Sequence, residues 1–205
     1  MINLNQSDLD QISKAVLEAE RHTTGEIVPM IVKQSDDYPG AHWRLAIVIS
    51  LLFGFLVYSC IDYSDSVWIL WAQIPGLYIG YWLGTFDTIL RPFLSSSKIE
   101  EEVHQRALQA FFSHNIHATK ERTGILIMVS LLEHRVEILA DTGINAKVSK
   151  DTWQKILAGM VSKIKSNELA DGICIAVKEC GKILEKDFPG THENPNEIKN
   201  KIIIE

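Results

Sequence analysis

The chain has 205 residues, of which 46% are hydrophobic and 22% charged, so it carries enough apolar side chains to fold rather than remain disordered. Its formal net charge of −6 argues against a nucleic-acid-binding protein, which needs a basic surface. Three cysteines without a CxxC pair exclude a disulfide framework and a structural zinc site built on such pairs.

The N-terminal segment predicts a helix followed by a strand. Residues 7–22 carry apolar side chains at helical spacing, with Ser7 as the N-cap. Gly25 is expected to end this helix in the left-handed conformation. Residues 26–32, with the sequence EIVPMIV, predict a strand. Because Pro29 cannot donate a hydrogen bond to a neighbouring strand, we expect this strand to lie at a sheet edge or to carry a bulge.

Two uncharged segments follow, over residues 45–61 and 67–86, and a short stretch that contains Asp62 and Asp65 separates them. Each segment is near the roughly 17 to 25 residues that a helix needs to cross a bilayer. Both are apolar around their whole circumference, and aromatic residues stand near their ends, as at membrane interfaces. The sequence therefore predicts a transmembrane hairpin over residues 44–86. The alternative is a buried helical hairpin in a soluble protein.

The basic residues predict how this hairpin is oriented. No Lys or Arg lies within residues 45–86, and Arg44 stands directly before them, so the positive-inside rule puts both flanks in the cytoplasm and the loop outside. Residues 1–34 show no signal-peptide pattern. We expect a two-span protein of the inner (plasma) membrane with both termini in the cytoplasm, whose partners are the lipid bilayer and other membrane proteins. Gly76, Gly80 and Gly84 form a small-residue face that packs either on the first span or on another copy.

The remainder of the chain predicts one domain that the hairpin interrupts. A buried central strand is expected at 125–131 and a partly exposed antiparallel strand at 135–140. Two helix–strand units imply a right-handed crossover between parallel strands. Helices are expected at 98–119, 150–165 and 171–186, and a short edge strand at 202–204. The fold class is therefore α/β, with a small mixed sheet between helix layers. Its parts are residues 1–35 and 95–190, followed by a polar C-terminal tail, 191–205.

Three stretches of the sequence form a recognisable pattern: TGEIVPMIV, RTGILIMVSLLEHRVEILADTGI and DGICIAVKECGKIL. This pattern resembles the TPM domain family, which includes thylakoid lumen phosphatase-like and photosystem II repair proteins. The resemblance implies an α/β/α sandwich. It also implies either acid phosphatase activity or a role in assembling and maintaining membrane complexes. The commonest arrangement in the family has a signal peptide and a C-terminal anchor, whereas this chain has an internal hairpin.

Three acidic residues are candidates for chemistry. If the strand at 135–140 returns antiparallel, Asp141 lies at the same sheet edge as Glu26, and Asp171 at a helix start could approach them. Such carboxylates could hold Mg²⁺ or Ca²⁺. The alternative is that Asp141 caps a turn, Asp171 caps a helix and Glu26 is solvated.

Other catalytic patterns are weak. His114 and His117 stand three residues apart near a helix end, where they either bind a metal or complement the helix dipole. The chain has no GxSxG, P-loop, GxGxxG or HExxH motif and no evident catalytic residue beyond Asp141. Two functions remain. The first is a non-enzymatic accessory or interaction module for membrane-protein complexes, held at the cytoplasmic face. The alternative is a divalent-cation-dependent acid phosphatase.

Overall fold

The computed structural model describes residues 4–60, 67–190, 198 and 202–205. The predicted loop between the apolar segments and most of the polar tail lie outside these residues. The chain divides into two units, which we describe separately. Unit 1 comprises Met1–Ser35 and Glu102–Glu205, and unit 2 comprises Asp36–Glu101.

Unit 1 is built on a mixed sheet. Strand β1 (Glu26–Val32) pairs in parallel with β2 (Gly124–Ser130), residue for residue over their whole length. Strand β3 (Arg135–Ala140) returns antiparallel to β2, and the two-residue strand β4 (Ile203–Ile204) pairs in parallel with β1. The order within the described residues is β3-β2-β1-β4. The predicted α/β class with a small mixed sheet is confirmed.

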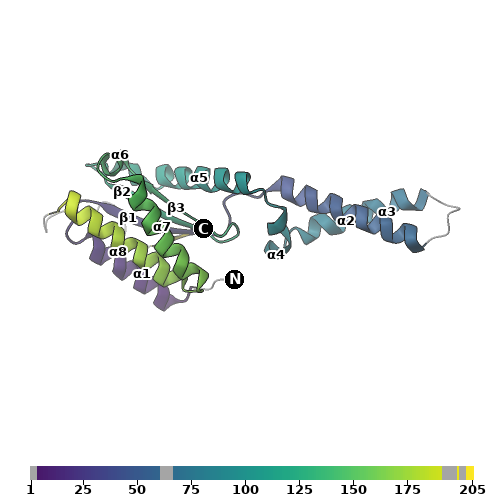
Figure 1. Ribbon diagram of the computed structural model, residues 1–205, viewed down its shortest axis with the longest axis horizontal. Coiled ribbons are helices and arrows are strands. Elements are labelled where there is room, and N and C mark those ends of the chain that lie inside the picture. Colours follow the sequence, from purple (N-terminus) through teal and green to yellow (C-terminus); the bar gives the residue numbers. More distant parts are fainter. Residues whose placement is uncertain (1–3, 61–66, 191–197, 199–201) are drawn as a thin grey trace. The chain divides into compact units, whose positions relative to one another are not determined.

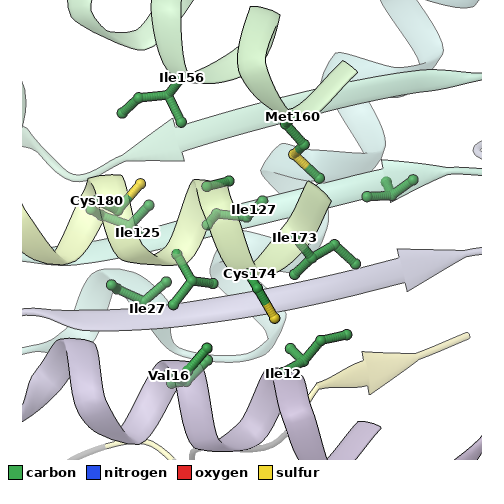
Figure 2. Close-up of a cluster of buried hydrophobic side chains, with 14 of the residues drawn as sticks. Ile12, Val16, Ile27, Ile125, Ile127, Ile156, Met160, Ile173, Cys174 and Cys180 are labelled. Atoms are coloured by element: carbon green, nitrogen blue, oxygen red, sulfur yellow. The ribbon is translucent and has the colours of Figure 1, made fainter. Parts of the chain in front are cut away.

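Helices cover both faces of this sheet. Figure 1 shows α1 (Gln6–Glu20), α7 (Lys150–Lys165) and α8 (Leu169–Asp187) on one face and α5 (Ser96–Ser113) on the other. The main core lies between the sheet and the first three helices. Figure 2 shows how their side chains meet there: Ile12 and Val16 from α1, Ile27, Ile125 and Ile127 from the strands, Ile156 and Met160 from α7, and Ile173, Cys174 and Cys180 from α8.

The start and end of α1 differ from the sequence prediction. Asn5, not Ser7, is the N-cap, because its side chain accepts the N–H of Asp8 while the Asp8 carboxylate accepts the N–H of Asn5. Gly25 does not adopt the left-handed conformation. A Cβ atom there would lie 2.6 Å from Cδ2 of Leu184 on α8, so a larger residue at position 25 would force that buried side chain to shift.

Pro29 lies in a regular strand that is paired on both sides, without the predicted bulge. The N–H of Lys33 donates to the carbonyl of Glu205, and the N–H of Glu205 donates to the carbonyl of Ile31. Because backbone direction alternates along a strand, the odd-numbered residues of β1 direct their N–H and C=O groups toward β4. Pro29 is odd-numbered, so its nitrogen, which carries no hydrogen, faces the same side. Strand β4 pairs with Met30 and Ile31 there, and among the described residues no strand pairs with Pro29 on that side. Locally, Pro29 therefore does lie at an edge.

Unit 2 contains an antiparallel helical hairpin. Helices α2 (Pro39–Cys60) and α3 (Val67–Leu83) pack side by side (Figure 1), and the short elements α4 (Asp87–Leu90) and η1 (Arg91–Phe93) follow.

The glycine face of α3 packs within the hairpin. A Cβ atom on Gly76 would lie 2.8 Å from Cα of Ser50, and one on Gly80 would lie 2.6 Å from Cα of Ala46. Such close approach is what small residues permit. The hydroxyl of Ser50 also donates to the carbonyl of Gln73, at 3.1 Å.

Within the described residues, α2 is the one helix that is long and apolar enough to cross a membrane. Helix α3 has 17 residues, which is at the short end of the spanning range. Membrane association thus has weak support from α2, and a two-span hairpin stays a prediction.

Candidate functional site

The predicted site lies where β1 and β2 begin and β3 ends. Glu26 pairs with Gly124 across the parallel strands, and the N–H of Asp141 donates to the carbonyl of Gly124, at 2.9 Å. The antiparallel return of β3 therefore brings Asp141 and Glu26 to the same edge of the sheet. Their backbones are separated by the single strand β2.

Asp141 is 3% exposed and is engaged on most sides. It is the N-cap of the short helix α6 (Thr142–Asn145), and its Oδ1 accepts the N–H of Thr142 at 2.6 Å. The same oxygen accepts Nε–H of Arg122 at 3.1 Å. Oδ2 is buried and has no hydrogen bond within the described residues, although it also lies 3.1 Å from Arg122 Nε. A cation at Asp141 would therefore have to compete with a guanidinium group.

Arg122 owes its position to the loop that precedes β2. Its backbone is left-handed, with φ of 57°, and the loop is held by the hydroxyl of Thr119, which accepts the N–H of Thr123. Gly143 approaches this loop closely, since a Cβ atom there would lie 2.7 Å from the carbonyl oxygens of residues 121 and 122. The ion pair of Arg122 and Asp141 thus joins the entry of β2 to the exit of β3.

A third carboxylate at this edge, Glu20, is missing from the sequence-based candidates. Its Oε1 accepts the N–H of Ile27 at 2.7 Å. Burial raises the pKa of Glu20 to about 8, the hydrogen bond from Ile27 lowers it, and the nearby charge of Glu26 raises it further. Glu26 itself is 7% exposed, so it is buried and not solvated. The sequence does place Glu20 and Glu26 on either side of a tight helix–strand turn, and this proximity is the signal that could have identified Glu20 as a candidate.

Asp171 does not join this edge. The C-terminal end of α8 lies there, because the N–H of Thr24 donates to the carbonyl of Phe188. Asp171 is in the first turn of the same helix, about 24 Å away along the axis at 1.5 Å per residue. Its Oδ1 accepts Nε2–H of Gln11 on α1, at 2.9 Å. Asp171 therefore does not approach Asp141 and Glu26, because the C-terminal end of α8, and not its N-terminal end, lies beside the site.

His114 and His117 make separate contacts and do not form a common site. His114 Nε2 lies 3.3 Å from Oε1 of Glu205, whereas the ring of His117 packs at a tilt of 53° against Phe112 with 4.9 Å between centroids. Among the residues that the structure describes, no three His, Cys, Asp or Glu side chains gather as metal ligands.

Another polar cluster, which the sequence does not indicate, lies at the carboxyl ends of the parallel strands. Glu133 is 3% exposed and its Oε1 accepts the N–H of Ser35 at 2.8 Å. Its Oε2 accepts the hydroxyl of Ser130, which in turn accepts the hydroxyl of Ser35 at 3.0 Å. Glu133 thus holds the loop after β1 directly through Oε1, and through Oε2 and the hydroxyl of Ser130.

Unit 2 exposes an extensive apolar surface. Most large hydrophobic side chains that are exposed in the described residues lie on its helices. On α2 they include Leu51, Leu52, Phe55 and Leu56, and on α3 they include Trp68, Leu70, Trp71, Ile74 and Tyr78. Aromatic rings gather at one end, where Trp43 and Tyr81 lie 5.5 Å apart between centroids. An aqueous monomer rarely exposes an apolar surface of this extent.

Comparisons with known proteins agree with the fold. A family model described as TPM domain matches residues 93–183. The chain is similar to a solved structure, the NMR structure of BA42 protein from the psychrophilic bacterium Bizionia argentinensis. The TM-score is 0.63 with 21% sequence identity, over 98% of this chain and 95% of that chain. At this identity the likeness concerns the fold alone. A search of curated proteins finds no match.

Proposed function

We propose that this chain, which contains a TPM domain within residues 93–183, is a membrane-anchored interaction module. Its α2–α3 hairpin crosses the inner membrane twice, its TPM domain lies on the cytoplasmic face, and it binds other membrane proteins rather than catalysing a reaction.

The exposed apolar surface of the hairpin carries this proposal. Leu51 is 60% exposed, Phe55 69% and Leu70 67%, and these side chains point away from the contact between α2 and α3. Burying such side chains in lipid removes them from water, which is worth about 1.5 to 3 kcal/mol for each fully buried side chain. The absence of Lys and Arg from residues 45–86 supports the cytoplasmic orientation of both flanks.

The geometry at the sheet edge favours a non-enzymatic role. Asp141 is held by a helix cap and by Arg122, and Asp171 bonds to Gln11 at a distance from it. Nothing in this arrangement supplies a nucleophile with an activating base.

Cysteine labelling tests the anchoring and its orientation with a residue that the chain already has. Cys60 is exposed at the end of α2, whereas Cys174 and Cys180 are buried. In intact cells, a membrane-impermeant maleimide should label the wild-type chain and not Cys60→Ser. In the Cys60→Ser background, Asp62→Cys should also be labelled from outside, and Lys155→Cys on α7 only after lysis.

The opposite labelling pattern would show that the orientation is wrong. Extraction of the chain from membranes by alkaline carbonate without detergent would overturn the anchoring itself.

The alternative function, a divalent-cation-dependent acid phosphatase, has one observation in its favour. Oδ2 of Asp141 is buried without a hydrogen bond in the described residues, at the same edge as Glu26. We expect no turnover of p-nitrophenyl phosphate with Mg²⁺ or Ca²⁺ at acidic pH. A rate that Asp141→Asn abolishes and the exposed control Asp151→Asn retains would establish the enzyme instead.

A further inference from the structure

The edge of β1 offers hydrogen bonds to another strand over a short stretch only. Near its start, the N–H of Ile27 is already bonded to Glu20, and Pro29 has no N–H. Farther along, the N–H of Lys33 donates to the carbonyl of Glu205, and the N–H of Glu205 donates to the carbonyl of Ile31, both at 2.9 Å. The edge therefore accepts about three residues of an extended segment, beside residues 30–33.

Two side chains, one on α5 and one just after its end, recognise the acidic end of this segment. Arg106 Nη2 donates to Oε2 of Glu205, and His114 Nε2 lies 3.3 Å from Oε1. Arg106 lies within α5 and His114 directly follows its last residue, and both side chains reach the carboxylate of Glu205. Main-chain pairing combined with a charged pocket for one side chain is the usual basis of strand addition to a sheet edge.

The segment that now occupies the edge is held by few contacts. Strand β4 has two residues, Ile204 is 57% exposed, and Ile202 is only partly buried against the core. Replacing β4 by a segment of the same chemistry would restore every interaction that its departure breaks.

We propose that the edge of β1 at residues 30–33, together with Arg106 and His114, is a docking site for an extended segment of a partner protein. That segment carries two aliphatic residues followed by an acidic one, and it displaces β4. This inference rests on the proposed role as an interaction module and specifies the kind of partner.

Peptide binding to the full chain in detergent micelles tests the site. The probe is a fluorescent peptide with the sequence of residues 198–205, amidated at its end so that its last side chain carries the recognised carboxylate. The comparison peptide has Gln in place of that Glu. The protein carries Glu205→Gln, which weakens its own β4.

We expect the Glu peptide to bind this protein at least about tenfold more tightly than the Gln peptide, as measured by fluorescence anisotropy. Adding Arg106→Gln should remove the difference between the peptides. Adding Arg21→Gln, at an exposed arginine that is the C-cap of α1, should keep it.

Equal binding of the two peptides, or no binding of either, would overturn the proposal. A wild-type dimer that Glu205→Gln dissociates would show instead that β4 of a second copy is the occupant. These outcomes leave the labelling of Cys60 unaffected, so failure of the docking site and failure of the membrane anchor are distinguishable.

Discussion

The carboxylate of Glu20, at the end of α1, accepts the backbone N–H of Ile27 on β1 with 2.7 Å between Oε1 and N. This bond satisfies a strand donor at the part of β1 that β4 leaves uncovered. Together with Pro29, which has no N–H, it leaves two fewer free donors on the part of this edge that no described strand covers. Sheet edges that keep their donors free invite pairing with other chains.

The buried position of Glu20 makes stability depend on pH. Its pKa rises from an ordinary 4.5 to about 8 in the folded chain. Protonated Glu20 therefore contributes its full stabilisation below pH 4.5, and this contribution is lost as the pH rises through 8. The slope is at most about 1.4 kcal/mol per pH unit between these values.

Urea unfolding at several pH values measures this dependence. Glu20→Gln, which keeps an oxygen acceptor for Ile27, should flatten the profile and should exceed the wild type in stability above pH 8. The exposed Glu185→Gln should leave the profile unchanged. Parallel profiles for the wild type and Glu20→Gln would refute the assignment.

Asp141 should prove important for stability rather than for catalysis. Asp141→Ala removes the cap of α6 and the partner of Arg122, and we expect it to cost about 2 kcal/mol. Asp141→Asn, which retains Oδ1 as an acceptor, should cost less. Denaturant midpoints measure both, with Glu185→Ala as the surface control. A neutral Asp141→Ala would contradict the structural role.

Replacing Gly124 or Gly159 by alanine should change the stability of the folded chain in opposite directions. A Cβ atom on Gly124 would collide with the backbone carbonyl of Ile116, so Gly124→Ala should destabilise unit 1 by about 1 to 3 kcal/mol. No atom lies within 4 Å of a Cβ built on Gly159 in α7. Gly159→Ala should therefore stabilise the chain by about 0.5 to 1 kcal/mol, through helix propensity. Thermal denaturation compares the two, and equal effects would contradict the packing.

Gly80 allows α2 and α3 to approach, so Gly80→Ala should lower the thermal midpoint in detergent micelles. Gly40→Ala in α2 is the control, because a Cβ atom there meets nothing within 4 Å. Identical midpoints for these two variants would mean that the hairpin does not depend on the contact of Gly80 with Ala46.

The three cysteines should differ sharply in reactivity. Burial raises the pKa of Cys180 to about 12, and it also raises that of Cys174. Because the thiolate is the reactive form, neither should react with a maleimide at pH 7.5 in the folded protein, whereas exposed Cys60 should. Mass spectrometry should find one adduct on the native chain and three after denaturation. Modification of Cys180 without denaturation would contradict the packing of α8.

Local patterns predicted the sheet well, because its strands are marked by apolar character. Strand β2 differs by one residue from the expected 125–131, and β3 has the expected bounds. Helix α5 ends at Ser113 rather than near 119, because Asn115 adopts a left-handed conformation with φ of 56°. No glycine or proline marks that end in the sequence.

The candidate site was less predictable, since it depends on contacts across the fold. The pairing of Asp141 with Gly124 follows from the antiparallel return of β3, which alternation indicates. The bond of Glu20 to Ile27, and the distance of Asp171 from the site, depend on the directions in which α1 and α8 run across the sheet. The spacing of residues along the chain does not predict those directions.

The register of β1 with β2 has a consequence for how the chain is made. Val32 pairs with Ser130, and all of unit 2 is synthesised between them. The nascent N-terminal segment must therefore wait, with the apolar face of β1 uncovered, until the ribosome has released nearly two thirds of the polypeptide. Long sequence separation slows such closure and prolongs exposure to aggregation. If the proposed hairpin enters the membrane before β1 and β2 can pair, it would hold the segments on both sides of it close together. The two strands would then find one another sooner.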